Sequence, residues 1–400
     1  MHAANFSRNG TMPMKGPRSD TVAMAVMVMV TVTLGILAIR LRPQVVPLRA
    51  MYIASGASGV ADLWAVVPGQ PDTLTQLTFS EGGVYDYAPS PDGRKIAYAE
   101  RDFASRRTTL KLLDLDSGAV TLLSDCIATN ADCHTPVWRP DGSALAYVRT
   151  QYDPVLGEGE PKIWMIEGIE SGALTEYRMF DEQTAGSQPV WSSDGRRLAF
   201  YEQASQGVLV YDFAPSDLTK NFSFFPADNG ITGALSPDGR LLVTSALEAA
   251  GEHEEGETAE EHAAHADAGF RPGLIVGDLE SGETRPLLPE GLPTDGQPAA
   301  WHPDGRRIAL LRRYGEDGAS VQGQQVYLYD VAAETLEPLI VDGAYNHGAL
   351  SFSPDGATLL LQRYSFETAR PQIWLYEMAT GTLTPLADNA YLAAWLTGTE

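Results

Sequence analysis

Three histidines stand within one strongly acidic segment, residues 247–270, which reads LEAAGEHEEGETAEEHAAHADAGF. They are His253, His262 and His265, and the segment contains eight acidic residues and no lysine or arginine. On a helix, His262 and His265 would share one face, and imidazoles beside carboxylates are ligands for Zn²⁺ or Cu²⁺. Two interpretations remain open, a zinc or copper site and a solvated acidic loop without a bound ion.

The chain has two cysteines, Cys126 and Cys133, in the polar stretch SDCIATNADCHTP. In an oxidising compartment they can close a disulfide across this short loop. The alternative is a pair of free thiols. A zinc site has less support, because His134 is the only further ligand beside the two cysteines.

A second set of candidate residues stands at the start of short apolar strands, and all of them except Tyr391 lie at or just before a copy of a phrase that contains Asp-Gly. If each phrase begins a strand, these residues meet at the mouth of a channel in a ring of strands. They could bind a ligand there, or form a metal-dependent active site around the two histidines; a polar rim without a ligand is the alternative. The set comprises Asp86, Tyr87, His134, Gln188, Thr232, Gln297, His347 and Tyr391.

Charge and motifs exclude several classes of function. The net charge of −24 argues against nucleic acid, whose phosphates the chain would repel. The sequence contains no G-x-S-x-G nucleophile elbow, no glycine-rich phosphate loop, and no H-E-x-x-H or C-x-x-C motif. We therefore expect a non-catalytic protein, with a propeller lyase or hydrolase as the alternative.

The Asp-Gly phrase occurs six times, as in PVWRPDGSALAYVR from Pro136 and LSFSPDGATLLLQR from Leu350. Each copy predicts a hairpin, because proline presets φ, aspartate bonds to nearby backbone, and glycine takes the positive φ of the turn. The same turn chemistry explains the repeated aspartates more simply than a calcium site shared between separate hairpins. They are Asp92, Asp141, Asp194, Asp238, Asp304 and Asp355.

A second hairpin follows each first one, as in IWLYEMATGTLTPLA from Ile373. Two hairpins make four antiparallel strands, and most copies lie 44 to 53 residues apart, the size of a propeller blade. An open stack of hairpins or a sandwich would leave more unprotected strand edges. The acidic segment 247–270 lengthens one blade, between its second and third strands.

The ends of the repeat region predict seven blades and a closed ring. Near residue 50, the chain supplies three strands that lack a first partner, and AYLAAWLTGTE at the other end reads as a lone first strand with Trp395 at the aromatic position. The last strand would complete the first blade. We therefore predict an all-β propeller over residues 50–400, closed by pairing of its N- and C-terminal strands.

The phrase resembles the WD-like Pro-Asp repeat of the TolB-type propellers, also found in propeller domains of prolyl oligopeptidase and dipeptidyl peptidase relatives. The turn Trp138-Arg139-Pro140-Asp141-Gly142 carries the resemblance, as do Ile373-Trp374 and the turn Thr380-Gly381. The resemblance covers about residues 50–400 and implies the fold. It does not imply a function, because different sites occur on one fold.

One segment near the N-terminus predicts a membrane helix. Residues 21–39 read TVAMAVMVMVTVTLGILAI, without charge or proline, and nineteen helical residues span about 28 Å. A cleaved signal peptide is the alternative, but Arg40 and Arg42 follow where small residues would be needed. We predict a tail at 1–20, an anchor at 21–41 and a linker at 42–49.

A short basic tail before the first hydrophobic segment favours a cytoplasmic N-terminus and an extracytoplasmic propeller at the cell membrane, although positive charges flank both ends of the segment. The predicted function is a tethered scaffold that binds a protein, peptide or glycan partner on one propeller face.

Overall fold

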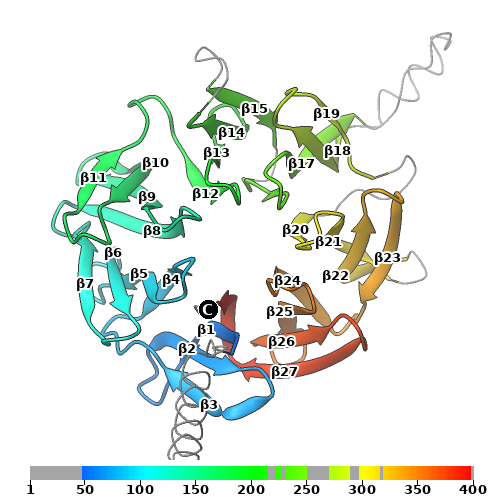
Figure 1. The fold of residues 1–400 in the computed structure, drawn as a ribbon, viewed down its shortest axis with the longest axis horizontal. Helices are drawn as coiled ribbons and strands as arrows, with labels where there is room; N and C mark the ends of the chain where they lie inside the picture. Colours follow the sequence, from blue (N-terminus) through cyan, green and yellow to red (C-terminus); the bar gives the residue numbers. More distant parts are fainter. Residues whose placement is uncertain are drawn as a thin grey trace, which may run out of the picture. The chain divides into compact units, whose positions relative to one another are not determined.

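The computed structural model describes residues 47–214, 221–227, 230–249, 270–288, 297–315 and 319–397, with side chains for all of them except 247–249, 270–272 and 297–299. These residues form seven four-stranded antiparallel sheets, arranged as the blades of a propeller (Figure 1). The predicted fold class and blade number are confirmed. Among the residues described, there is no helix with the length and apolar character needed to cross a membrane. The predicted tail and anchor lie outside the described residues, as does most of the linker.

Blade 1 combines the first three strands with the last one, and each later blade uses four consecutive strands. Blade 1 consists of β28 Ala390–Leu396, β1 Arg49–Ser55, β2 Ala61–Val67 and β3 Gln70–Gln76. Blade 2 consists of β4 Val84–Pro89, β5 Lys95–Arg101, β6 Thr108–Asp114 and β7 Val120–Ser124. Blade 3 consists of β8 Ala131–Trp138, β9 Ala144–Asp153, β10 Gly157–Glu167 and β11 Thr175–Arg178. Blade 4 consists of β12 Ser187–Trp191, β13 Arg197–Glu202, β14 Gly207–Asp212 and β15 Phe222–Pro226. Blade 5 consists of β16 Ala234–Leu235, β17 Leu241–Ala249, β18 Phe270–Asp278 and β19 Thr284–Pro286. Blade 6 consists of β20 Gln297–Trp301, β21 Arg307–Tyr314, β22 Ser320–Asp330 and β23 Thr335–Ile340. Blade 7 consists of β24 Tyr345–Phe352, β25 Thr358–Ser365, β26 Pro371–Glu377 and β27 Thr382–Asp388.

The six aspartates of the repeated phrase close the first hairpin of blades 2 to 7. In blade 2, the Asp92 carboxylate accepts a hydrogen bond from the Ser90 hydroxyl at 2.6 Å and one from the Arg94 N–H at 3.1 Å. Gly93 takes φ 66°, a left-handed conformation that a side chain would strain. The equivalent glycines of the other five turns have φ between 67° and 73°. These aspartates therefore serve the turns, as the sequence predicted.

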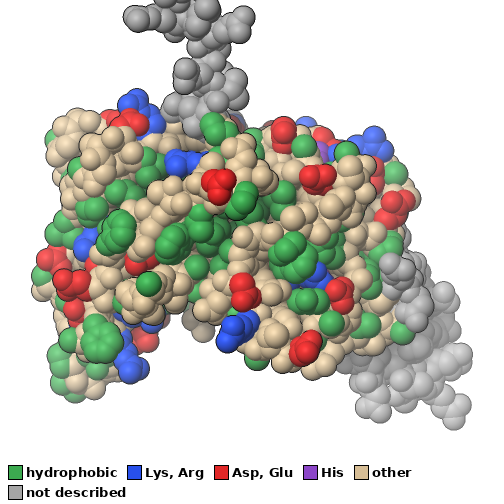
Figure 2. Space-filling model, turned by 90° about the horizontal axis from the view of Figure 1, so that it is seen from below, with side chains coloured by type: hydrophobic (Ala, Val, Ile, Leu, Met, Phe, Trp, Pro, Cys, Tyr) green, Lys and Arg blue, Asp and Glu red, His purple; other side chains and the backbone are tan. Residues whose placement is uncertain are grey.

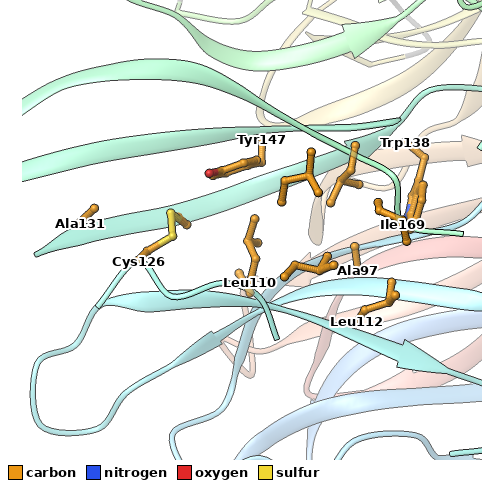
Figure 3. Close-up of a cluster of buried hydrophobic side chains, with 13 residues drawn as sticks. Ala97, Leu110, Leu112, Cys126, Ala131, Trp138, Tyr147 and Ile169 are labelled. Atoms are coloured by element: carbon orange, nitrogen blue, oxygen red, sulfur yellow. A yellow bond between two sulfur atoms is a disulfide. The ribbon is translucent and has the colours of Figure 1, made fainter. Parts of the chain in front are cut away.

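The core consists of seven apolar clusters, one at each boundary between neighbouring blades. Strand alternation produces it: in β5, Ile96 and Tyr98 pack toward blade 1, whereas Ala97 and Ala99 pack toward blade 3. Both faces of an inner strand are therefore buried. Figure 3 shows the cluster between blades 2 and 3, where Leu110 and its neighbours face Tyr147 and Trp138.

The aromatic residue that precedes the turn also links blades. The indole N–H of Trp138 donates to the Ala88 carbonyl of the preceding blade at 3.1 Å, and that of Trp301 donates to the Ala234 carbonyl at 3.1 Å. Trp191 occupies the same position in blade 4, but its Nε1 is buried without a hydrogen-bond partner in the described part of the chain.

The predicted closure of the ring is confirmed. β28 pairs with β1 in an antiparallel ladder, with Ala50 opposite Trp395 and Arg49 opposite Leu396. We call the end of the ring with the Asp-Gly turns the turn face. The opposite end, with the connections between blades and the hairpins between second and third strands, is the loop face. Thr397 bonds to Pro91 in the first turn, so the chain enters β1 and leaves β28 at the turn face.

The ends of the acidic segment pair as the second and third strands of blade 5, with Ala249 opposite Phe270. The predicted position of this insertion within its blade is confirmed. Residues 250–269, including His253, His262 and His265, lie outside the described residues.

Candidate functional site

The structure places the predicted rim residues along the innermost strands, toward their loop-face ends (Figure 1). Thr232 lies two residues before β16, and each of the others lies in an inner strand. Gln188 is exposed, Asp86, His134 and Tyr391 are half-buried, and Tyr87, Thr232 and His347 are buried. Gln297 begins β20, and its backbone pairs with that of Leu311 in β21.

A bulge interrupts the inner strands at this level and sets the direction of the side chains. The register shifts after His134 in β8, and Thr135 has φ 52°. Equivalent positive φ values occur at Gln188 (50°), Ala349 (47°) and Leu392 (51°). Because a bulge re-aims the residues around it, neighbouring positions in sequence point into different surroundings.

Several rim side chains bond to the backbone of an adjoining blade. The carboxylate of Asp86 accepts the N–H of Thr135 at 3.1 Å, and the Thr232 hydroxyl donates to the Gln188 carbonyl at 2.7 Å. The Tyr87 hydroxyl donates to the Leu392 carbonyl at 2.6 Å. These bonds join blades 2 and 3, 4 and 5, and 1 and 2. They give the side chains a structural role at the mouth of the ring.

Burial raises the pKa of Asp86 above its ordinary value, although the N–H of Tyr87 and the charge of His134 act against this shift. His134 itself bonds through Nδ1 to the Thr135 hydroxyl at 2.8 Å, and its ring lies 6.1 Å from that of Tyr85. Asp86, His134 and Thr135 therefore form one polar cluster between blades 2 and 3.

His347 belongs to a different environment, at the boundary of blades 6 and 7. Its side chain is fully buried, Nδ1 bonds to the Gln324 carbonyl at 2.7 Å, and Nε2 has no partner in the described region. Burial, with a smaller contribution from the nearby Arg363 guanidinium, lowers the pKa of His347 to about 4. Arg363 stacks 3.7 Å from the Tyr345 ring and forms an ion pair with Asp342. His347 is thus held as a neutral imidazole.

The two rim histidines do not meet. His134 is in blade 3 and His347 is in blade 7, so blades 1 and 2 separate them on one side of the ring and blades 4 to 6 on the other. Within the described ranges, no group of three or more His, Cys, Asp or Glu side chains is arranged to hold a metal ion.

A feature that sequence reasoning missed lies on the loop face of blades 1 to 3. The most exposed large apolar side chains of the described residues project there, on the β3–β4 loop, the β5–β6 hairpin and the β9–β10 hairpin. They are Phe79, Phe103, Val155 and Leu156, which are 81%, 87%, 91% and 87% exposed. Figure 2 shows hydrophobic side chains with adjacent cations on the projecting corner at lower left, the side where Figure 1 places blades 2 and 3. The sequence signal that could have revealed this surface is the apolar pair Val155 and Leu156 in the turn Asp-Pro-Val-Leu, residues 153–156.

A disulfide braces the base of this surface. Cys126, in the loop between β7 and β8, is joined to Cys133 of β8, and both are fully buried (Figure 3). Within the same loop, the Asn130 side chain donates to the Tyr152 carbonyl at 2.6 Å, and the Tyr152 N–H donates back to the Asn130 carbonyl at 2.9 Å. Arg107 of the β5–β6 hairpin also bonds to Asn130. One cross-linked loop therefore holds the bases of both projecting hairpins.

No family model matches the chain. The curated relative "Uncharacterized protein Atu1656" of Agrobacterium fabrum is 33% identical over 114 residues, which are 27% of this chain and 38% of that protein. The chain thus covers well under two thirds of the relative.

Solved structures match over most of the propeller. A prolyl endopeptidase has a TM-score of 0.56 at 17% identity, over 86% of this chain and 48% of its own length. The β-propeller domain of the Trilobed protease from Pyrococcus furiosus has a TM-score of 0.52 at 15% identity, over 78% of this chain and 85% of that domain. TolB from Acinetobacter baumannii also matches, with a TM-score of 0.48 and 16% identity over 87% of this chain and 66% of TolB.

The Pyrococcus propeller is described as having an open Velcro topology, whereas β28 pairs with β1 here. At these identities the likeness concerns the fold alone. The chain is a seven-bladed β-propeller.

Proposed function

We propose that this propeller is a non-catalytic binding module for a protein, peptide or glycan partner, held at the outer side of a cell membrane by residues 21–41. The observation that carries the binding role is the group of four exposed apolar side chains on the loop face. Soluble proteins rarely leave large apolar side chains grouped and open to water unless they contact a partner. The braced loop beneath them reduces the ordering that binding would require.

The polar residues of the channel mouth support the same proposal. Asp86, Tyr87, Thr232 and His347 use polar atoms on backbone groups within the ring. The enzyme alternative depended on a site around His134 and His347, and these lie in blades 3 and 7. A binding module does not require these two histidines to lie close together.

The extracytoplasmic location is part of the proposal. The buried disulfide between Cys126 and Cys133 supports it, because disulfides persist in oxidising compartments. The uncharged segment at 21–39 supports the anchor. A reporter enzyme fused after residue 400 tests the orientation: activity confined to a cytoplasmic reporter would contradict it.

Crosslinking of the full-length chain in intact membranes, followed by identification of what co-purifies, tests the binding role. The His134→Ala/His347→Ala double variant is the comparison. A binding module retains its crosslinked partner in this variant. An enzyme that works through these histidines loses turnover of its substrate, and that loss, without any captured partner, would contradict the proposal.

A further inference from the structure

We infer that the β5–β6 hairpin is the centre of a docking surface for a protein segment that presents an apolar side chain beside carboxylates. The inference rests on the proposed binding function and specifies its place and its chemistry. It is drawn from a hollow, from three neighbouring arginines that have no ion-pair partner among the described residues, and from the position of both on the ring.

A hollow of about 200 Å³ opens beside the hairpin. Phe103 and Ile127 form its apolar walls, and Glu81, Arg101 and Asp102 also line it. Lys111 and Glu100 also line it and neutralise each other, with 2.9 Å between Nζ and Oε2. Pockets for drug-sized ligands are roughly 300–1,000 Å³. This hollow is smaller and suits one apolar side chain of a partner, as in the pockets that hold anchor residues of interfaces.

The hairpin is cationic in an otherwise acidic protein. Residues 101–107 include three arginines and one aspartate, in a chain of net charge −24. Asp102 is engaged by the N–H of Ser105 at 2.6 Å. No ion pair within 4.0 Å joins Arg101, Arg106 or Arg107 to a carboxylate in the part of the chain that the structure describes.

Aromatic rings hold two of these arginines in position. The Arg101 guanidinium lies 4.7 Å from the Tyr85 ring centre, and that of Arg107 lies 4.3 Å from the Tyr152 ring centre. Arg106 is exposed at the end of the hairpin. A guanidinium stacked on a ring keeps N–H groups for a carboxylate, with which arginine forms bidentate hydrogen bonds. The partner that fits therefore carries aspartate or glutamate beside its apolar residue.

A protein fits this surface better than a lipid bilayer. The neighbouring β9–β10 hairpin, which carries Val155 and Leu156, also exposes Asp153 and Glu158. A bilayer would contact both hairpins at once, so these acids would repel its anionic headgroups. A protein segment can instead place its carboxylates at the arginines of the β5–β6 hairpin alone. The chain enters the ring at the turn face, whereas all four apolar tips project from the loop face. The surface is thus directed away from the point where the N-terminal segment joins the propeller.

Display of random twelve-residue peptides against the full-length chain, followed by affinity measurement by fluorescence anisotropy, tests this inference. The variants are Phe103→Ser and Arg106→Glu, both at exposed positions. Matched controls on the turn face of the same blade are Val120→Ser, which is 54% exposed in the native chain, and Arg94→Glu. We expect selected peptides to combine an aromatic or aliphatic residue with Asp or Glu. They should bind each loop-face variant at least tenfold more weakly and each control unchanged.

Selection of basic peptides, no selection, or peptides indifferent to both loop-face variants would overturn the inference. Phe103-dependent binding to anionic phosphatidylserine vesicles, or self-association lost in the same variants, would do so as well, by assigning the surface to a bilayer or a second copy. If a partner captured in intact membranes binds both loop-face variants normally, that result would contradict this inference but not the proposed function. Failure to capture any partner would contradict the proposed function.

Discussion

The indole N–H of Trp395 donates to the carbonyl oxygen of Ser351 at 3.0 Å and joins the last strand of the chain to blade 7. The same strand pairs with β1, so one seven-residue strand connects the final blade to the first. Trp395 also packs in the apolar cluster between blades 7 and 1, with Tyr52 and Leu375. Closure of the ring thus depends on hydrogen bonds and apolar burial at one seam.

We expect Trp395→Phe to lower the free energy of unfolding by about 1 kcal/mol more than Trp191→Phe does. Both tryptophans occupy the same position of their blades, but the Nε1 of Trp191 has no hydrogen-bond partner among the described residues. Their substitutions therefore differ mainly by one blade-to-blade bond. Urea denaturation of the two variants and the wild type measures the difference; equal losses would mean that the bond contributes nothing to closure.

The sequence predicted the features that repetition determines. The turns, the blade size, the closing strand and the position of Trp395 could all be read by comparing copies of one phrase. The bulge at Thr135 and Gln188 could not, because residues other than glycine adopt positive φ there under the constraint of the ring. The burial of His347 depends on Gln324 from another blade, so no local pattern reveals it.

The loop-face surface was also beyond the sequence. Val155 and Leu156 are two apolar residues in a polar stretch, and such residues are more often buried than exposed. Their exposure follows from the length of the β9–β10 hairpin, with strands of ten and eleven residues. Only the folded chain shows that Phe79 and Phe103 project from the same face.

Removal of the disulfide should destabilise the propeller by about 2.5 kcal/mol, the loop-closure entropy of a short cross-linked segment. Urea denaturation of Cys126→Ser/Cys133→Ser against the wild type measures this loss. Alkylation of unreduced protein taken from cells should label neither thiol, because the two cysteines are joined. Labelling of both in freshly isolated protein would place the propeller in a reducing compartment.

Acidification should weaken the fold through His347. Its folded pKa is about 4, below the ordinary value near 6.5, so the unfolded chain binds a proton in this range that the folded chain does not. The stabilisation that neutral His347 contributes to the fold is fully present above pH 6.5 and declines as the pH falls toward 4. Between pH 7.5 and 5, the loss from this group should be about 2 kcal/mol.

The variant His347→Gln keeps a donor for the Gln324 carbonyl but does not titrate. Between pH 7.5 and 5, its free energy of unfolding, measured with urea, should fall by about 2 kcal/mol less than that of the wild type. An identical pH dependence in both proteins would show that another group is responsible.

The turn aspartates should contribute to stability without any metal. Asp355 accepts the Ser353 hydroxyl at 2.5 Å and the Ala357 N–H at 3.0 Å, and these bonds keep the pKa of its carboxyl below its ordinary value. Asp355→Ala should cost about 1 kcal/mol. Thermal unfolding with calcium and with a chelator should give the same Tm in the wild type; a Tm raised by calcium would favour an ion at these turns.

Zinc or copper binding at residues 247–270 stays a prediction. Calorimetric titration of the full-length chain with Zn²⁺ should show at least micromolar affinity that His262→Ala/His265→Ala weakens at least tenfold. His134→Ala is the matched control, since this histidine belongs to the ring. Heat that is equal in all three proteins would identify the segment as a solvated acidic loop.

Photocrosslinking from defined positions in intact cells tests the central claim, that the propeller binds a partner through its loop face. A photoreactive amino acid is placed at residue 103 or 156 on the loop face, and at residue 94 or 120 on the turn face of blade 2. The account predicts one partner protein crosslinked from positions 103 and 156 and absent from positions 94 and 120. Crosslinks from the turn-face positions alone, or from none of the four, would contradict it.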